Sequence, residues 1–134
     1  MARAIDRLVY CSRAAQPEAA DAVMAEVLRA SQRNNHRDGL TGALACHDGR
    51  FIQVIEGPPE ALDRLQARLA ADPRHTDMVV LGRSQVVGRL FDLWTMASAR
   101  ITPELKPTMD ALMDEPTPSP ARTVALLMQA VSRR

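Results

Sequence analysis

Apolar and polar side chains alternate along the first part of the chain, as they do in a strand whose two faces have different surroundings. A strand over residues 6–12 places Leu8, Tyr10 and Ser12 on one face. Cys11 lies on the opposite face. The pattern therefore predicts the first strand of a sheet, with a tyrosine among its inward-facing residues.

Two later segments show the spacing of amphipathic helices. The first helix begins at Pro17, carries acidic residues in its first turn, and should end near Arg33. The second begins at Pro59 and is closed by Asp72-Pro73. The buried stripe of the first helix consists of Ala20, Met24, Val27, Leu28 and Ser31, and that of the second consists of Leu62, Leu65 and Leu69.

The remaining elements of the main unit are strands. Residues 34–39 have the composition of a turn, and strands are expected at 40–47 and 50–56, joined by a hairpin turn at Asp48-Gly49. Another strand begins at 78–81, and one more is expected within 91–101. The order β-α-β-β-α-β plus one extra strand predicts an α+β, ferredoxin-like sheet with both helices on one face.

This topology also predicts how the elements face each other. The strands 6–12 and 50–56 are expected to be adjacent, parallel and central. Both helices follow such strands, so we expect them to run in the same direction, with their carboxyl ends together at one edge.

The tail has a different character. Five prolines punctuate it, and two short helices are expected at 104–113 and 121–131. The second has an apolar stripe, which we expect to cover the sheet face that the first two helices leave open. The stripe consists of Val124, Leu127, Met128 and Val131. The predicted organisation is a domain at 1–101 and a helical extension at 102–134 that packs on the sheet.

Composition narrows the classes of protein. The 134 residues are 46% hydrophobic and 25% charged, which is typical of one soluble domain. A net charge of +1 and an aromatic content of 3% argue against nucleic-acid binding. There is no membrane-spanning run and no recognisable signal segment, so we expect a cytoplasmic protein. Cys11 and Cys46 lack metal-ligand spacing and fit buried thiols in a reducing compartment, with no metal site.

Gln53 is the most informative polar residue, because it lies in the apolar strand Phe51-Ile52-Gln53-Val54-Ile55. A buried amide without hydrogen bonds costs about 1–3 kcal/mol, so it needs partners. In the expected topology Tyr10 lies beside it beneath the two helices, and a phenol and an amide can satisfy each other in part. An ordinary core pair is one interpretation; a polar ligand held by Gln53 is the other.

The predicted carboxyl ends of both helices are rich in polar residues. Solvated helix ends, with cations near the negative ends of the helix dipoles, would explain the arginines but not the buried Tyr and Gln. A planar heterocycle between the helices would explain the buried Tyr and Gln as well, with Val27 and Leu69 gripping its faces and Asn35, Gln53 and Arg68 bonding its edge. A flavin has such an edge. The polar residues at these ends are Arg33, Asn34, Asn35, His36, Arg37, Arg68, Asp72, Arg74 and His75.

Over residues 6–100 the chain resembles a BLUF domain, the blue-light sensor that uses FAD, of the short single-domain type. Six segments in the same order and spacing carry the resemblance. They are Arg7-Leu8-Val9-Tyr10, Ser31-Gln32-Arg33-Asn34-Asn35, Leu40-Thr41-Gly42, Phe51-Ile52-Gln53-Val54-Ile55-Glu56-Gly57, Asp72-Pro73-Arg74-His75 and Arg89-Leu90-Phe91-Asp92-Leu93-Trp94-Thr95-Met96.

The resemblance implies a role for each residue of the groove. Tyr10 would donate an electron and then a proton, Gln53 would bridge the phenol and the flavin N5 and O4 edge, and Asn35 would hold the O4 and N3 side. Light would leave Gln53 rotated or in its imidic tautomer. The whole implied cofactor-binding set is Tyr10, Val27, Ser31, Asn34, Asn35, Gln53, Arg68, Leu69, Asp72, Arg74 and His75, in which Arg68 and Arg74 match positions for pyrimidine or phosphate contacts and Asp72 one near the ribityl chain.

Signal output is expected at Trp94 and Met96, which lie two residues apart on one predicted strand. Their alternative role is that of ordinary core residues. The signal would leave through the tail helices, through a homo-oligomer or through a separate downstream protein. FAD is the expected cofactor, with FMN or riboflavin as alternatives.

Two other functions are alternatives to a photoreceptor. A light-independent ferredoxin-like module for small-molecule binding or protein interaction is the main alternative, and bound flavin would separate the two. An acylphosphatase-like enzyme would need a phosphate-cradling loop after the first strand, but residues 11–16 contain no glycine. We therefore expect no enzyme.

Overall fold

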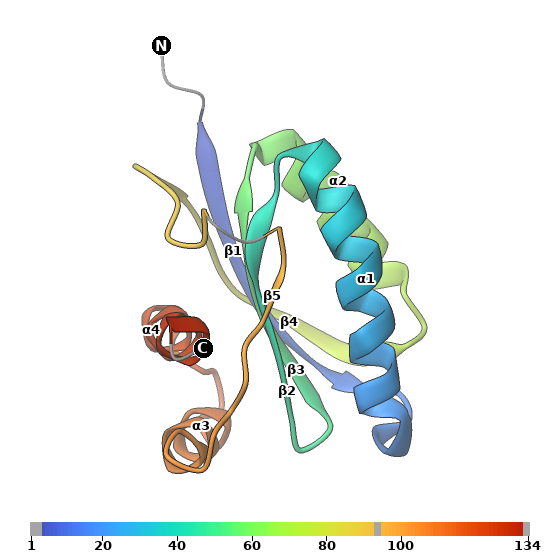
Figure 1. The fold of residues 1–134 in the computed structure, drawn as a ribbon, viewed down its shortest axis with the longest axis vertical. Coiled ribbons are helices and arrows are strands. Elements are labelled where there is room, and N and C mark those ends of the chain that lie inside the picture. Colours follow the sequence, from blue (N-terminus) through green and yellow to red (C-terminus); the bar gives the residue numbers. More distant parts are fainter. Residues whose placement is uncertain (1–3, 93–94, 133–134) are drawn as a thin grey trace.

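A computed structural model describes residues 4–92 and 95–132 (Figure 1). Its centre is a five-stranded sheet with the strand order β4-β1-β3-β2-β5. The strands are β1 (Ile5–Ala14), β2 (Thr41–His47), β3 (Arg50–Gly57), β4 (His75–Val86) and β5 (Ala97–Ser98). The predicted ferredoxin-like α+β sheet with an extra strand is confirmed.

Helices lie on both faces of the sheet (Figure 1). One face carries α1 and α2, and the other carries α3 and α4. The helical elements are a short 3-10 turn η1 (Pro17–Ala19), α1 (Ala20–Asp38), α2 (Pro59–Ala71), α3 (Lys106–Met113) and α4 (Pro120–Ser132). The domain is thus a three-layer arrangement with a shared central sheet.

The predicted parallel pairing of the two central strands is wrong. β1 and β3 are antiparallel, with Tyr10 directly opposite Gln53. The hairpin at Asp48-Gly49 reverses the chain between β2 and β3, and β2 lies beyond β3 with the same direction as β1. The adjacency of the two strands was predicted correctly, but their relative direction was not.

The helices consequently run in opposite directions, so their carboxyl ends do not meet at one edge (Figure 1). Arg74, just after α2, reaches Glu26 in the middle of α1, with 3.4 Å between its Nη1 and the Glu26 Oε2. The polar end of α1 instead lies beside the body of α2, where Asn34 and Arg68 line the same cavity. The two sets of polar residues therefore meet along the helices rather than at their ends.

The first helix is longer than predicted. The polar run 34–38 was expected to form a turn, but it continues α1 to Asp38. The helix ends at Gly39, whose φ of 72° is a left-handed conformation that glycine adopts without steric cost. The amide N–H of Leu40 then donates a hydrogen bond to the carbonyl of Asn35, at 2.9 Å, across the end of the helix.

Each face of the sheet has its own apolar core. Under α1 and α2, Leu8, Tyr10 and Ile55 are buried against the helices. On the other face, Ile52 and Val54 are buried against the tail helices. The residues of the predicted tail stripe, Val124, Leu127, Met128 and Val131, all belong to this second core. The prediction that the tail covers the open face is confirmed.

The last two strands differ in length from the prediction. β4 extends over twelve residues, whereas β5 is only two residues long and pairs in parallel with Ala43 and Leu44 of β2. In the described part of the segment 91–101, side chains bind the backbone of Phe91, Thr95 and Met96, and residues 97–98 form the strand. The hairpin between β2 and β3 also contacts the tail: His47 Nε2 lies 2.7 Å from Asp110 Oδ1, and Arg50 donates to the Met113 carbonyl.

Glu56 anchors the chain between β4 and β5. Its carboxylate is fully buried and accepts the amide N–H groups of Leu90 and Phe91, at 2.8–3.0 Å. The carboxylate also accepts a hydrogen bond from Arg7 Nε at 2.8 Å. Arg89 adds donations to the Thr41 hydroxyl and to the Glu56 carbonyl. This cluster holds the start of the loop against the edge of β3.

We expect Glu56→Ala to lower the free energy of unfolding by about 3 kcal/mol, because it leaves two amides and one guanidinium without their buried acceptor. Urea unfolding followed by circular dichroism measures this change. Glu18→Gln, at an exposed position of η1, is the matched control and should change stability by less than about 0.5 kcal/mol. Equal effects of the two substitutions would contradict the anchoring role of Glu56.

Candidate functional site

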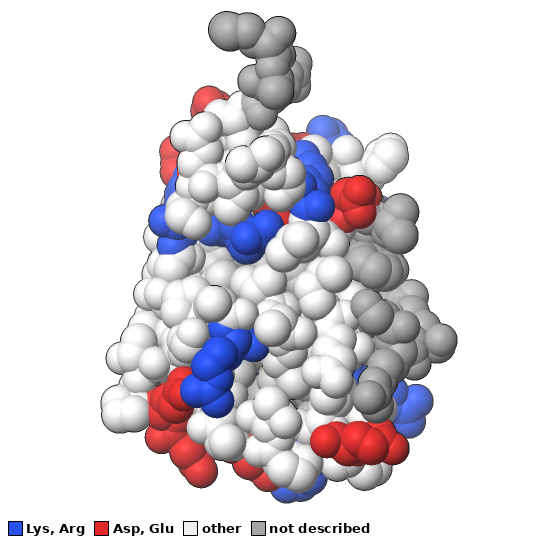
Figure 2. Space-filling view, turned by 90° about the vertical axis from the view of Figure 1, so that its left-hand side faces the viewer, with Lys and Arg blue, Asp and Glu red and all other residues white. Residues whose placement is uncertain are grey.

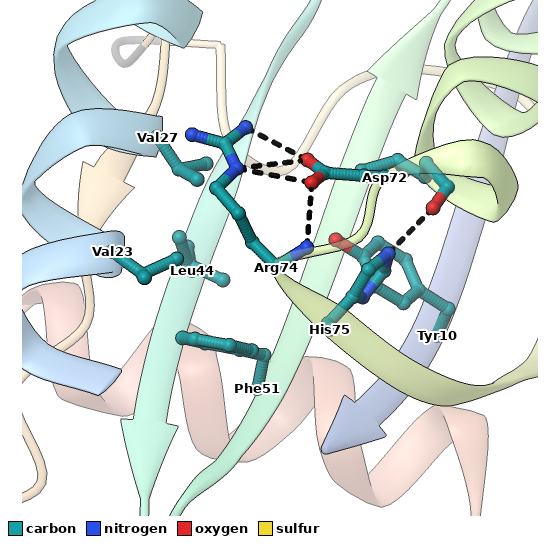
Figure 3. A pocket seen from close by; sticks show the side chains of 9 residues that line it. Tyr10, Val23, Val27, Leu44, Phe51, Asp72, Arg74 and His75 are labelled. Atoms are coloured by element: carbon teal, nitrogen blue, oxygen red, sulfur yellow. Dashed lines mark hydrogen bonds and ion pairs between the residues drawn. The ribbon is translucent and has the colours of Figure 1, made fainter. Parts of the chain in front are cut away.

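A groove lies between α1 and α2 above the sheet (Figure 3). One part is a hollow, partly open to solvent, that is lined by Tyr10, Val23, Val27, Leu44, Phe51, Leu69, Asp72, Arg74 and His75. The neighbouring part is also partly open and is lined by Ala30, Ser31, Asn34, Asn35, Leu65, Arg68, Leu69, Ala71, Asp72 and Arg74. The two parts are adjacent, because Leu69, Asp72 and Arg74 line both of them.

The groove has an apolar interior and polar groups along its length. Val27 from α1 and Leu69 from α2 line the same part of it, as predicted. Asn35 and Arg68 line the neighbouring part from the two helices. A cavity with apolar walls and a few polar groups is the usual form of a small-molecule site.

Tyr10, which lines the groove, forms a buried pair with Gln53, its neighbour on β3, which is not itself a lining residue. Their side chains are 3% and 2% exposed, and the Tyr10 hydroxyl donates to Gln53 Oε1. Burial, followed by the nearby Asp72 charge, raises the pKa of the Tyr10 phenol well above its usual value. The phenol is therefore a protonated donor at neutral pH.

The other end of the Gln53 amide contacts Met96. Gln53 Nε2 lies 3.2 Å from the Met96 sulfur, which accepts its N–H. Gln53 thus has a donor on one side and an acceptor on the other. Met96, one of the two expected output residues, is therefore in contact with Gln53, whereas Trp94 lies outside the described residues.

Two amides of α1 hold the segment beside Gln53. Asn35, which is 3% exposed, donates from Nδ2 to the Thr95 carbonyl at 2.8 Å. Gln32 donates from Nε2 to the Met96 carbonyl at 3.2 Å. Gln32 is not among the predicted site residues, although its three-residue spacing from Asn35 indicates a shared helix face.

Charged groups lie at the mouth of the groove (Figure 3). The Arg74 guanidinium binds the Asp72 carboxylate, with 2.7 Å between Nη2 and Oδ2. This hydrogen bond lowers the pKa of Asp72 below its usual range. His75 Nδ1 lies 2.7 Å from the Ser12 hydroxyl, and its ring stands edge-on to that of Tyr10 with 6.4 Å between centroids.

The fold therefore brings the predicted binding residues to one groove. Ser31, Asn34, Asn35 and Arg68 line one part, and Tyr10, Val27 and His75 line the other, with Leu69, Asp72 and Arg74 between them. Gln53 joins the set through its bond to Tyr10. Their contacts with a cofactor remain predictions.

Comparison with known proteins identifies a family. The family model described as "Sensors of blue-light using FAD" (BLUF) matches residues 5–97. The photoactivated adenylate cyclase subunit beta of Euglena longa is 38% identical over 96 residues, which is 71% of this chain and 11% of that protein. The alpha subunit of Euglena gracilis is 36% identical over 71% of this chain and 9% of its own length. The chain thus spans about a tenth of these relatives.

Solved structures agree with the sequence comparison. The dark-state structure of BlrB, a BLUF protein, has a TM-score of 0.78 at 31% identity and covers 99% of this chain and 98% of its own. A bacterial light-regulated adenylyl cyclase has a TM-score of 0.73 at 28% identity, covering 81% of this chain and 33% of its own. In the described part of the chain, every helix is too short or too polar to cross a membrane.

Tyr10 is the only tyrosine in the chain, so its ionisation can be followed alone. Because its pKa is raised in the folded protein, its contribution to stability is complete below the unfolded value of about 10 and is lost as pH rises beyond it. We expect the tyrosinate absorption to appear only on alkaline unfolding. Tyr10→Phe should be less sensitive to pH above about 10 in urea unfolding. Tyrosinate formation near pH 10 in the folded protein would contradict this prediction.

Proposed function

The chain belongs to the BLUF family of blue-light sensors that use FAD, and from this premise we propose that it is a photoreceptor that binds FAD non-covalently between α1 and α2. The observation that carries the proposal is the buried amide of Gln53, which lies between the Tyr10 hydroxyl and the Met96 sulfur. The family is a sensory one, and the cyclase activity in the names of longer relatives is not transferred to this chain.

The donor set of the groove fits a flavin. Its apolar walls suit the faces of a planar ring, and its side-chain amides suit a ring edge that alternates hydrogen-bond donors and acceptors. The amide nitrogen of Asn35 has two N–H groups, only one of which is needed for the Thr95 carbonyl. In the proposal, Asn35 holds the O4 and N3 side of the ring, and Gln53 faces N5 and O4.

The remaining residues of the groove bind the rest of the cofactor. Arg68 and Arg74 serve the pyrimidine carbonyl or the phosphates, and Asp72 lies near the ribityl chain. Asp72 also orients Arg74 through their ion pair. Val27 and Leu69 pack on the ring faces, while Ser31, Asn34 and His75 complete the lining. FAD is the proposed cofactor, with FMN and riboflavin as alternatives.

A bound flavin supplies blue-light absorption and, in its excited state, an electron acceptor. Tyr10 gives up an electron and then a proton, and Gln53 passes the proton because it is bonded to the phenol. Return of the electron and the proton to Tyr10 would leave no net redox change. Gln53 is left rotated or in its imidic tautomer, with a different set of donors facing the ring edge.

The altered amide has two consequences. With a flavin bound, a stronger hydrogen bond from Gln53 to the ring would lower its excited-state energy relative to the ground state and shift its absorption to the red. In the dark arrangement the Gln53 N–H binds the Met96 sulfur. Reorientation of the amide redirects this N–H, so the contact with Met96 changes. Thermal return of the amide restores the dark arrangement.

The proposed output passes from Met96 through β5 to the tail. Residues 1–101 form the photosensory unit and 102–134 the extension, which packs on the sheet. Figure 2 shows the side of the molecule where the tail lies; its middle carries few charged side chains. Depletion of charge is typical of the core of a protein interface. We propose a separate signalling protein, or a second copy of the chain, as partner, and a cytoplasmic location.

The first test is the colour of the protein. Purified protein reconstituted with FAD should show a blue absorption band that is structured by the binding site. Illumination should shift the band to the red, and darkness should reverse the shift. If the protein fraction from gel filtration showed no flavin band different from that of free flavin, the light-independent binding module would be favoured instead.

The second test removes the amide. Gln53→Leu should retain flavin, because the apolar walls remain, but should lose the light-induced red shift. Tyr10→Phe should lose the shift as well, because the electron and proton donor is absent. Gln129→Leu, on the exposed side of α4, is the matched control and should behave as the unmodified protein. A normal red shift in Gln53→Leu would rule out the proposed switch.

A further inference from the structure

The segment around Met96 connects the groove to the rest of the molecule. Its sulfur contacts Gln53, and the next two residues form β5. The amide N–H of Ala99 then bonds the Leu44 carbonyl at 2.8 Å, and the chain continues to α3. Because β5 has only two residues, few backbone bonds fix this segment. Side-chain hydrogen bonds must therefore supply much of its position.

Three amide side chains bind two consecutive residues of this segment. Asn35 binds the Thr95 carbonyl, and Gln53 binds the Met96 sulfur. Gln32 binds the Met96 carbonyl. Two of the three, Asn35 and Gln53, also face the proposed flavin. Asn35 lines the groove and Gln53 is bonded to the lining residue Tyr10, whereas Gln32 bonds Met96, which is not a lining residue.

We propose that Gln32 is a positioning residue for the light response. It holds the Met96 backbone where the sulfur can accept the Gln53 amide, and it thereby stabilises the dark arrangement. When Gln53 turns away, Met96 leaves this position and the Gln32 bond is lost with it, so thermal recovery has to form the bond again. The inference rests on the proposed photoreceptor function, but the bond itself exists in the dark and can be tested there.

The direction of the effect follows from the state that the bond stabilises. Loss of the Gln32 bond raises the free energy of the dark arrangement, and part of this cost appears in the transition state for thermal recovery. Recovery from the light state should therefore become slower. A single neutral hydrogen bond of this kind corresponds to a change of roughly two- to tenfold, so we expect about threefold.

Substitutions at Gln32 can separate donation from mere occupancy. Ala, Lys and Glu all have helix propensities close to that of Gln, so α1 should be preserved. Gln32→Ala removes the donor, and Gln32→Glu replaces it with an acceptor. Gln32→Lys restores a donor that can reach the Met96 carbonyl. Arg33→Ala, at the next and exposed position of α1, is the matched control.

The experiment uses the FAD-loaded full chain and follows the red shift and its decay. We expect normal red shifts in all variants, about threefold slower recovery in Gln32→Ala and Gln32→Glu, and recovery close to normal in Gln32→Lys and Arg33→Ala. Recovery that is unchanged or faster in Gln32→Ala would overturn the inference, as would normal recovery in Gln32→Glu.

Hydrogen exchange in the dark provides a readout that does not depend on light. Amides of residues 96–99 should exchange about threefold faster in Gln32→Ala and Gln32→Glu than in the unmodified protein, and Gln32→Lys should restore protection. Equal exchange in all variants would overturn the inference. If the unmodified protein gave no red shift, the proposed function would fail, while this measurement would still decide whether Gln32 positions Met96.

Discussion

The antiparallel pairing of β1 with β3 is the constraint on which the rest of the site depends. Its register places Tyr10 directly opposite Gln53, on the face that α1 and α2 cover. The phenol and the amide can leave water only because each finds a partner there, since an unpaired polar group in the core is costly. The pair therefore forms part of the fold before it has any role toward a cofactor.

The second partner of Gln53 extends the polar contact to another part of the chain. Met96 belongs to the segment between β4 and β5, which has little sheet pairing of its own. Glu56 and Arg89 hold the beginning of this segment, and the amides of α1 hold its end. The loop is thus fixed mainly by side chains. A change in the hydrogen bonds of a single amide can act on such a segment more readily than on a strand in the middle of the sheet.

The sheet also connects its two faces. Neighbouring residues of β3 alternate between the core under α1 and α2 and the core under the tail, so Gln53 has Ile52 and Val54 on either side, both packed toward α3 and α4. The hairpin that ends β2 contacts α3 through His47 and Arg50. The tail is consequently in contact with the strands that form the floor of the groove, and a displacement at that floor has a short path to the opposite surface.

The sequence by itself determined which elements form, apart from the end of α1 and the lengths of the last two strands, and which residues are candidates for the site. Alternation in β1 and β3, helical spacing in α1 and α2, and the apolar stripe of α4 are local patterns, because each depends on which face of one element is buried. They identified Tyr10 and Gln53 as inward-facing neighbours. Only the tertiary structure decided the antiparallel direction of the central strands, the opposite course of the two helices and the contact of Gln32 with Met96. These depend on chain reversal at the hairpin and on contacts between residues 64 positions apart, for which a single segment carries no pattern.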